Sequence, residues 1–317
     1  MILSPIEQSI KRKIEAVGTP LKDWDIQINY GIKTGFNDAF IITSEKRNEI
    51  LSNCATEDER KKTDELIRPI LRGRDIKRYG YEWAELYLIA TFPARHYDIN
   101  QYPAVKQYLL SFAYEYLLQN GNAWVANNHL EEFCKQKLTQ DGQYVVINGK
   151  HVIDDRGNKE KGRKKTSNKW FETQDSISYW EEFFKPKIIW KRIGSILRFS
   201  YDEKGVFGLD STCFATGTDV AYICCILNSI MGHYLLKDSP KTGTGDLLVS
   251  VQAIEPIKVP YSLKEQTALT LLLKQNKESI NSSFEEQINT TVFSLYGLSS
   301  EEITYVTDYV IQSQQSQ

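Results

Sequence analysis

The sequence predicts an α+β protein: a mixed α/β body on a twisted, mainly antiparallel sheet, followed by a C-terminal helical appendage. Three observations lead to this class. Short runs of alternating apolar and polar residues recur within residues 21–260, which is the pattern of strands. An Asn-Gly pair and other Gly-containing turns join several of these runs, which favours antiparallel hairpins. From residue 261 onward the apolar residues follow a helical period instead.

The first elements follow from capping signals and periodicity. Ser4-Pro5-Ile6-Glu7 is a capping box with Pro at the first helical position, so a helix is expected over 4–17. Alternation over 24–30 predicts a strand, and the run 39–42 predicts a second. Ser44 and the Thr56-x-x-Glu59 box are expected to begin two short helices.

The middle of the chain alternates between the two kinds of element. Residues 70–76 are expected to form a strand and turn, 87–92 a buried strand, and 103–118 a helix. Asn148-Gly149 predicts the turn of a hairpin over 145–153. The polar segment 154–169 is the candidate for a mobile loop.

Strands are expected next over 188–190 and 196–201, with a turn over 202–205. An apolar helix capped by Asp219 is expected to reach Leu236, and a strand could follow over 247–251. A second capping box begins at Ser262, and helices are expected over 263–280, 284–295 and 300–311. We therefore divide the chain into a connector helix (1–20), a body (21–260) and a helical appendage (261–317).

Composition excludes several classes of protein. The 317 residues are 41% hydrophobic, carry a formal charge of −2 and include five Cys. An odd number of Cys without a C-x-x-C pair argues against a disulfide framework or a zinc ribbon, so reduced thiols in the cytoplasm are expected. Residues 220–236 are too short and too polar for a membrane span, and the N-terminus lacks a signal-peptide pattern. No membrane partner is expected.

Charge is unevenly distributed along the chain. Three segments are strongly basic: 68–78 carries +4, whereas 161–169 and 185–201 carry +5 each. The helical end, 261–317, carries −4. Lys and Arg in such clusters bind phosphates of nucleic acids, although a single basic run is more often only a solvated face. Three runs in one body favour a positive, phosphate-binding surface.

No self-contained active site is evident. The nucleotide-binding, zinc-protease and serine-hydrolase motifs G-x-x-x-x-G-K-[ST], H-E-x-x-H and G-x-S-x-G are absent. Gly243-Thr244-Gly245-Asp246 follows no strand, so a loop is the better interpretation than a cofactor cradle. Asp202-Glu203-Lys204 has the residue types of a nuclease site, but a hairpin turn explains it better. The four His residues lie far apart in the sequence, and Cys224-Cys225 is expected to pack in the core. Neither a metal nor a cofactor is expected in this chain.

Five blocks, in order, resemble the TaqI-like C-terminal specificity domain, which is the target-recognition part of type IIG restriction–modification enzymes and related adenine-specific DNA methyltransferases. The first, second and last blocks read GIKTGFNDAF, IRPILRGRDIKRY and VFSLYGLSSEEI; all five cover residues 31–40, 67–79, 185–214, 227–229 and 292–303. Together they extend over nearly the whole chain.

The resemblance implies a division of labour. This chain would recognise double-stranded DNA, and a methyltransferase domain or subunit would bind S-adenosylmethionine and methylate adenine N6. The chain itself lacks the N-P-P-Tyr/Phe motif of that catalytic partner and any nuclease motif, so it would be non-catalytic. It would be either the C-terminal part of a longer enzyme or a separate specificity subunit, with the helix over 4–17 as connector. The alternative is an interaction module that docks the methyltransferase without binding DNA itself.

The candidate DNA-binding residues come from the basic clusters and the first block. Phosphate contacts are expected from two groups of cations, namely Arg72, Arg74, Lys77, Arg78, Lys191, Arg192 and Arg198 in the first group, and Arg163, Lys164 and Lys165 in the second. Base or backbone contacts are expected from Lys33, Thr34 and Asn37. The alternative for Arg74 and Arg78 is pairing with Asp75 or with acids of the appendage. The DNA sequence recognised cannot be predicted.

Overall fold

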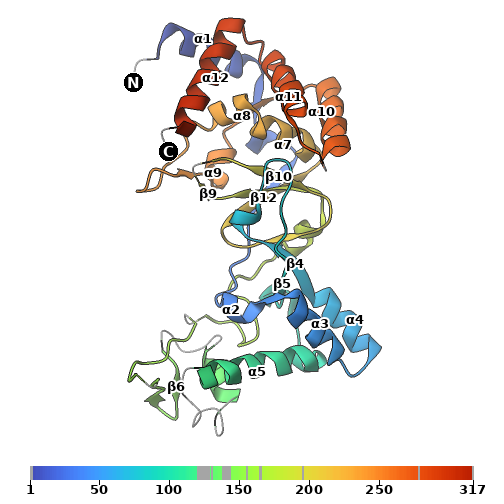
Figure 1. The fold of residues 1–317 in the computed structure, drawn as a ribbon, viewed down its shortest axis with the longest axis vertical. Helices are drawn as coiled ribbons and strands as arrows, with labels where there is room; N and C mark the ends of the chain where they lie inside the picture. Colours follow the sequence, from blue (N-terminus) through green and yellow to red (C-terminus); the bar gives the residue numbers. More distant parts are fainter. Residues whose placement is uncertain are drawn as a thin grey trace. The chain divides into compact units, whose positions relative to one another are not determined.

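The computed structural model describes residues 3–119, 129, 131–137, 144–154, 156–163, 166–194, 196–277 and 279–315 (Figure 1). Contacts between residues divide the chain into two compact units. The first unit comprises 1–31, 71–83 and 181–317, and the second comprises 32–70 and 84–180. Both units are therefore assembled from separate stretches of sequence. The boundaries at residues 20 and 260 remain a prediction.

A four-stranded antiparallel sheet organises the first unit. Its strands are β2 (Ile26–Tyr30), β8 (Lys187–Lys191), β10 (Phe199–Asp202) and β12 (Thr212–Gly217), in the order β10-β8-β12-β2. Two short ribbons accompany it: β1 (Gly18–Pro20) pairs with β14 (Lys258–Pro260), and β9 (Ile193–Gly194) pairs with β13 (Leu247–Leu248). The expected mixed fold with mainly antiparallel strands is confirmed.

Helix α7 (Val220–Asn228) covers one face of this sheet. All nine of its residues are buried, and the first eight, 220–227, share an apolar core with Ile188, Trp190 and Cys213 of the strands. The side chain of Asn228 bonds both the N–H and the C=O of Phe199, at 3.0 and 2.7 Å. This pairing fastens the end of the helix to β10.

The expected single helix to Leu236 is wrong, because the chain breaks at Ser229. Ser229 has an extended backbone, and its hydroxyl caps a second helix, α8 (Ile230–Leu235), by accepting from Gly232 N–H. Asp219 occupies the N-cap position of α7, as expected, but its side chain makes no cap hydrogen bond.

Aromatic rings cover the opposite side of the sheet. Phe183, in the short helix η5 (Trp180–Phe184), packs on Phe207 of β11 (Phe207–Gly208) and on Phe214, with ring centroids 4.5 and 4.4 Å apart. Beside them, Lys187 Nζ lies 2.5 Å from Asp202 Oδ2, and both side chains are fully buried. Burial lowers the pKa of Lys187, and Asp202 opposes this shift.

The Asp202 carboxylate also accepts from the backbone N–H groups of Lys204, Gly205 and Val206. Asp202-Glu203-Lys204 therefore lies in a turn, with its aspartate bonded to the backbone and to Lys187, but the expected hairpin is wrong because β10 does not pair with β11. The bonds of Asp202 account for the buried carboxylate without a catalytic role.

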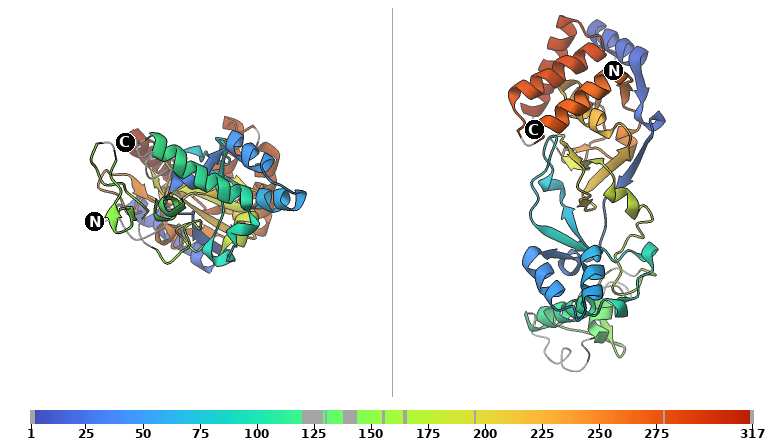
Figure 2. Two further views of the ribbon diagram at one scale, coloured as in Figure 1. Left: turned by 90° about the horizontal axis from the view of Figure 1, so that it is seen from below. Right: turned by 90° about the vertical axis from the view of Figure 1, so that its right-hand side faces the viewer.

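Helices from both ends of the chain complete the first unit (Figure 2). They are α1 (Pro5–Val17), α9 (Val251–Ile254), α10 (Leu263–Asn276), α11 (Ser282–Leu295) and α12 (Ser300–Gln315), with a short helix η1 (Leu21–Asp23). The Ser4–Glu7 capping box is present. The box expected at Ser262 is not, because the Ser262 hydroxyl donates to the Glu265 carboxylate instead of accepting from the helix. Helix α9 also replaces the end of the strand expected over 247–251.

The second unit has a smaller antiparallel sheet. Strand β5 (Leu86–Ile89) pairs with β3 (Ile41–Thr43) on one side and with β4 (Ile67–Leu71) on the other. Its helices are α2 (Asn37–Phe40), α3 (Ser44–Ser52), α4 (Glu57–Leu66) and α5 (Pro103–Gln119), with the short helices η3 (Pro93–Arg95) and η4 (Ile99–Gln101). Thr43 and Thr56 cap α3 and α4, so the expected short helices are confirmed. The strand expected over 39–42 is partly wrong, since α2 takes its first half.

The expected Asn-Gly hairpin is confirmed in the second unit. Strand β6 (Val146–Ile147) pairs with β7 (Lys150–His151), and the turn residues Asn148 and Gly149 have φ of 49° and 74°. Two successive positive φ values are typical of the type I′ turn that Asn-Gly favours. In the described part of both units, no helix combines the length and the apolar character needed to cross a membrane.

Candidate nucleic-acid interface

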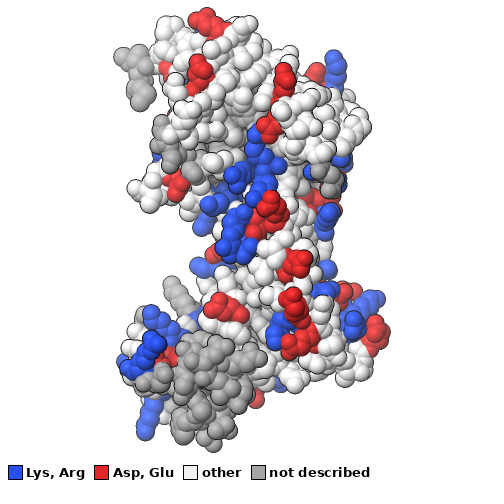
Figure 3. All heavy atoms as spheres, viewed as in Figure 1, with Lys and Arg blue, Asp and Glu red and all other residues white. Residues whose placement is uncertain are grey.

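Two of the three basic clusters meet at one end of the sheet in the first unit. The turn that begins η2 (Gly73–Asp75) docks on the end of β8, because Ser211 accepts from Gly73 N–H through its hydroxyl and from Arg192 N–H through its carbonyl, at 3.0 and 2.9 Å. Lys191 lies across Gly73, where a Cβ would come within 2.9 Å of Lys191 Cγ. The basic turn and the basic strand end are therefore neighbours, and Figure 3 shows Lys and Arg gathered over these strands.

Three cations of these two basic segments have no ion-pair partner among the described residues: Arg74 and Lys191, which are exposed, and Arg198, which is half-buried. Phe199 pairs with Trp190, so Arg198 and Lys191, the next residues along the chain, lie at the same end of this strand pair. Like charges held close together repel each other. An anionic ligand would relieve this repulsion, so the arrangement suits a polyanion.

Arg192 lies at the edge of the same surface. It is half-buried, and its guanidinium carbon is 6.0 Å from the centroid of the Tyr30 ring. The ring supports the cation without neutralising it. We call Arg74, Lys191, Arg192 and Arg198 the basic surface of the first unit.

The other expected cations of segment 72–78 are already paired. Arg72 makes a two-pronged bond to Asp75, with Nε–Oδ2 and Nη2–Oδ1 distances of 3.0 and 2.7 Å, and this bond raises the pKa of Arg72. Arg78 lies 2.6 Å from Glu285 and donates to the carbonyl of Asn228. Lys77 lies 3.0 Å from Glu82. The contacts of these three cations hold the fold together. For Arg78 the structure shows the alternative to DNA binding that the sequence left open, which is pairing with an acid of the helical end.

Arg163 is an interior residue of the second unit and not a surface cation. Only 2% of it is exposed, and Nη1 donates to the carbonyls of Thr34 and Glu172 at 3.0 and 2.8 Å. We therefore remove Arg163 from the candidate phosphate contacts. Lys164 and Lys165 lie outside the described residues.

The loop of the first sequence block exposes two of its three candidate residues. Lys33 and Asn37 are exposed, whereas Thr34 is 1% exposed. Gly35 has a φ of +81°, and a Cβ there would come within 2.4 Å of Arg163 Cδ. Glycine is thus required twice, by conformation and by the close approach of Arg163. Thr34 shapes the loop and is not available to a ligand in this conformation.

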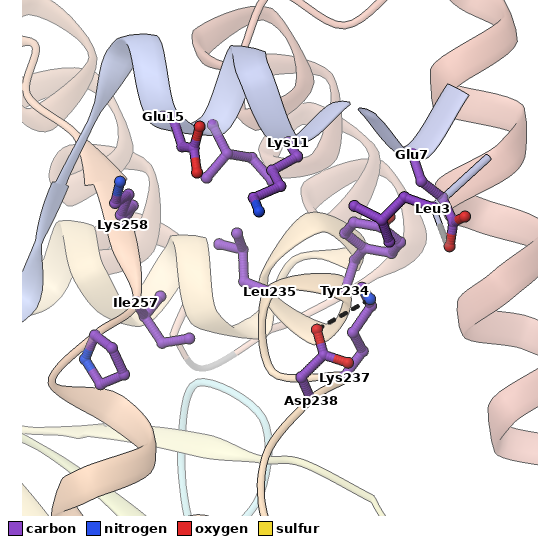
Figure 4. Close-up of a pocket in the computed structure, with 12 residues that line it drawn as sticks. Leu3, Glu7, Lys11, Glu15, Tyr234, Leu235, Lys237, Asp238, Ile257 and Lys258 are labelled. Atoms are coloured by element: carbon purple, nitrogen blue, oxygen red, sulfur yellow. Dashed lines mark ion pairs between the residues drawn. The ribbon is translucent and has the colours of Figure 1, made fainter. Parts of the chain in front are cut away.

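A pocket of about 370 Å³ in the first unit offers no equivalent chemistry (Figure 4). It lies between α1, α8 and β14, and Lys11, Glu15 and the Lys237–Asp238 ion pair line it beside Leu235 and Ile257. The pocket is therefore lined by apolar side chains and by charged side chains of both signs.

In the same unit the Gly243–Asp246 segment forms an exposed turn, in which Thr242 N–H donates to the Asp246 carbonyl at 2.8 Å. In the described residues no cluster of His, Cys, Asp or Glu could hold a metal ion.

Sequence reasoning missed Ser211, which joins the two basic segments. Its role depends on the pairing of residues 138 positions apart, and a single serine in a turn carries no local signal of it. Sequence reasoning also gave no account of Ile193 and Ile196, two exposed apolar side chains between the cations of the β8–β10 connection.

The sequence profile of the TaqI-like C-terminal specificity domain matches residues 68–250, which is more than half of the chain. The chain belongs to this family. The resemblance drawn from the five blocks is confirmed, and the three central blocks lie within or at the edge of the matched range. Specificity domains of this family are parts of restriction–modification enzymes, so the family supports a recognition role and not a catalytic one.

Two solved structures share the fold. The type IIL restriction–modification enzyme MmeI, determined in complex with DNA, aligns with 95% of this chain at a TM-score of 0.50 and 10% identity. The type IIG restriction endonuclease BpuSI aligns with 98% at a TM-score of 0.52 and 11% identity. The chain spans only 37% and 33% of those two proteins. No curated protein sequence matches it.

Proposed function

We propose that this chain recognises a specific sequence in double-stranded DNA on behalf of a restriction–modification enzyme. The observation that carries the proposal is the basic surface of the first unit, where Arg74, Lys191 and Arg198 have no ion-pair partner among the described residues. Phosphate contacts of this kind fix a protein on the duplex, and neighbouring side chains then read bases. The family and the fold shared with MmeI support the same role.

The chemistry would be carried out elsewhere. An adenine-N6 methyltransferase domain or subunit, with S-adenosylmethionine as its cofactor, would act on the base that this chain selects. Such enzymes rotate their target base out of the duplex because its reactive atom is inaccessible in the stack. The recognition chain would bind the duplex and hold it in position relative to the methyltransferase while the base is rotated out.

Fluorescence anisotropy of the intact chain with labelled duplex DNA tests the proposal. We expect affinity to fall linearly in a log–log plot against salt concentration, because cations of the basic surface release counterions from the DNA. Lys191→Glu should weaken binding roughly tenfold and reduce the salt slope by about 1 or more.

The matched control is Lys264→Glu, the same charge reversal at a lysine of α10 whose side chain is 91% exposed. It should change the affinity less than about twofold, because its charge lies outside the basic surface and is screened by salt. Equal effects of the two substitutions would contradict the assigned surface. No binding at low salt would instead favour the alternative, an interaction module that docks the methyltransferase.

A further inference from the structure

The loop of residues 33–37 is fixed by the segment 163–175 of the same unit. Thr34 O accepts from Gln174 N–H and from Arg163 Nη1, both at 3.0 Å. Lys33 pairs with Asp175 twice, through its carbonyl and through its N–H, each at 3.2 Å. Because these bonds hold the loop backbone, the exposed groups that the loop offers to a ligand are the side chains of Lys33 and Asn37.

The buried hydroxyl of Thr34 fixes which way the Asn37 amide points. Phe36 N–H donates to Thr34 Oγ1 at 3.1 Å, and Thr34 Oγ1 lies 2.5 Å from Asn37 Oδ1. The hydroxyl hydrogen needs an acceptor, and Asn37 Oδ1 is the one found for it among the described residues. A distance of 2.5 Å also suits O–H···O and is too short for N–H···O. Rotating the amide by 180° would leave the buried hydroxyl hydrogen without an acceptor.

This orientation makes Asn37 a donor toward solvent. An asparagine reads adenine with its oxygen and its nitrogen together, and here one of the two lone pairs of that oxygen is occupied by Thr34. The NH₂ group of this exposed residue can only donate, and the neighbouring Lys33 ammonium is likewise a donor without acceptor capacity. Both side chains therefore favour hydrogen-bond acceptors.

We propose that Asn37 is a donor contact of the second unit for acceptor atoms on DNA, either the O6/N7 edge of guanine or a phosphate oxygen. Thr34 is its positioning residue, because its hydroxyl fixes the orientation of the Asn37 amide. This proposal rests on the proposed function, which it deepens by naming the chemistry that the loop recognises.

Binding of selected duplex DNA to the intact chain tests the contact. Asn37→Asp replaces the donor with an acceptor and a negative charge, so we expect at least a tenfold loss of affinity. The matched control is Asn53→Asp, which makes the same change at an exposed residue after α3 and should leave affinity within twofold. If Asn37→Asp binds like the wild type while the wild type keeps its salt-dependent binding, the donor contact is wrong and the proposed function stands. If the wild type binds no DNA, both fall.

A double-mutant cycle tests the positioning role of Thr34. Thr34→Val removes the hydroxyl and should weaken binding in the wild type, but it should have no further effect in an Asn37→Ala background. Thr34→Ser keeps the hydroxyl and should restore wild-type affinity. Equal losses from Thr34→Val in both backgrounds would show that Thr34 acts only on stability and would overturn this role.

Modified DNA distinguishes the two sources of the acceptor. If Asn37 contacts a guanine edge, 7-deazaguanine in the selected site lowers wild-type affinity but not that of Asn37→Ala. If Asn37 contacts a phosphate, a methylphosphonate at one backbone position has that effect instead. Wild type and Asn37→Ala responding alike to every modification would overturn the contact.

Discussion

At the scale of single residues, buried polar side chains in this protein hold loops in place. Arg163 is the strongest case, since its guanidinium joins the carbonyls of Thr34 and Glu172 in the interior of the second unit. Burial lowers the pKa of Arg163 to about 10, against the opposing attraction of Glu172. The group thus remains charged at pH 7, and its hydrogen bonds are charge-assisted.

Arg163→Met is expected to lower the free energy of unfolding by about 2–3 kcal/mol, because the interior carbonyl of Glu172 loses its donor and that of Thr34 keeps only Gln174 N–H. Urea denaturation followed by circular dichroism measures this change. Arg156→Met, at an exposed arginine of the same unit, should stay within about 0.5 kcal/mol of the wild type. A variant at Arg163 as stable as the wild type would mean that desolvation of the cation cancels its hydrogen bonds.

The candidate cations show how far sequence reasoning reaches at this scale. Clusters of Lys and Arg are visible in the sequence, and the partner of Arg72 lies three residues away in the same motif. The carbonyl partner of Arg78 is 150 residues away along the chain, so nothing local separates Arg78 from the unpaired Arg74. Which cation is free for a ligand depends on the tertiary structure.

At the scale of elements, α1 is tied to α12 by one carboxylate. Glu302 Oε2 lies 2.6 Å from Lys13 Nζ and accepts from Ser299 N–H, and Oε1 accepts from Ser9 Oγ. Burial alone would raise the pKa of Glu302, but the bonds from Lys13, Ser299 and Ser9 outweigh it and lower the pKa to about 2. The ionised form is therefore the one that joins the first helix to the last.

This depressed pKa predicts an acid-sensitive contact. A carboxyl whose folded pKa lies below its ordinary value of 4.5 contributes stability that is fully present above pH 4.5 and is lost as the pH falls toward 2. We expect Glu302→Gln to lower stability at pH 7 and to flatten the fall in stability across this range. Thermal unfolding as a function of pH measures both effects.

Glu301→Gln supplies the control, because Glu301 is exposed in the same turn of α12. That variant should retain the wild-type pH profile between pH 4.5 and 2. If the Glu302 and Glu301 variants have the same profile, the tie between α1 and α12 contributes nothing that depends on ionisation.

Elements with strong local signals were predictable, and those set by packing were not. The Asn148-Gly149 turn needs positive φ at two residues, which Asn and Gly tolerate. The break at Ser229 lies inside a continuous apolar run, and it forms because Ser229 caps α8 while Asn228 bonds to β10. Periodicity alone cannot separate one buried helix from two.

At the scale of the whole molecule, each unit is built from stretches that are distant in sequence. In the first unit β12 pairs with β2 from near the N-terminus, and α1 joins α12. Local patterns could predict the fold class and the helical end. They could not predict this interleaving, because strand partners far apart along the chain leave no periodic signal.

The helical end is predicted to be inseparable from the sheet of the first unit. The apolar core that buries Ile188 and Trp190 also contains Leu269, Leu273, Phe284, Ile288, Val292, Val306 and Val310, each at most 5% exposed, from α10, α11 and α12. Losing these side chains at about 1.5–3 kcal/mol each would remove roughly 10–20 kcal/mol, which matches or exceeds the stability of a typical protein.

A chain of residues 1–260 should therefore show no cooperative thermal transition, whereas a chain lacking only residues 312–317 should unfold like the wild type. Cooperative unfolding of the 1–260 chain near the wild-type Tm would show instead that the helices are a separate appendage, and DNA binding by that chain would locate the recognition surface wholly outside them.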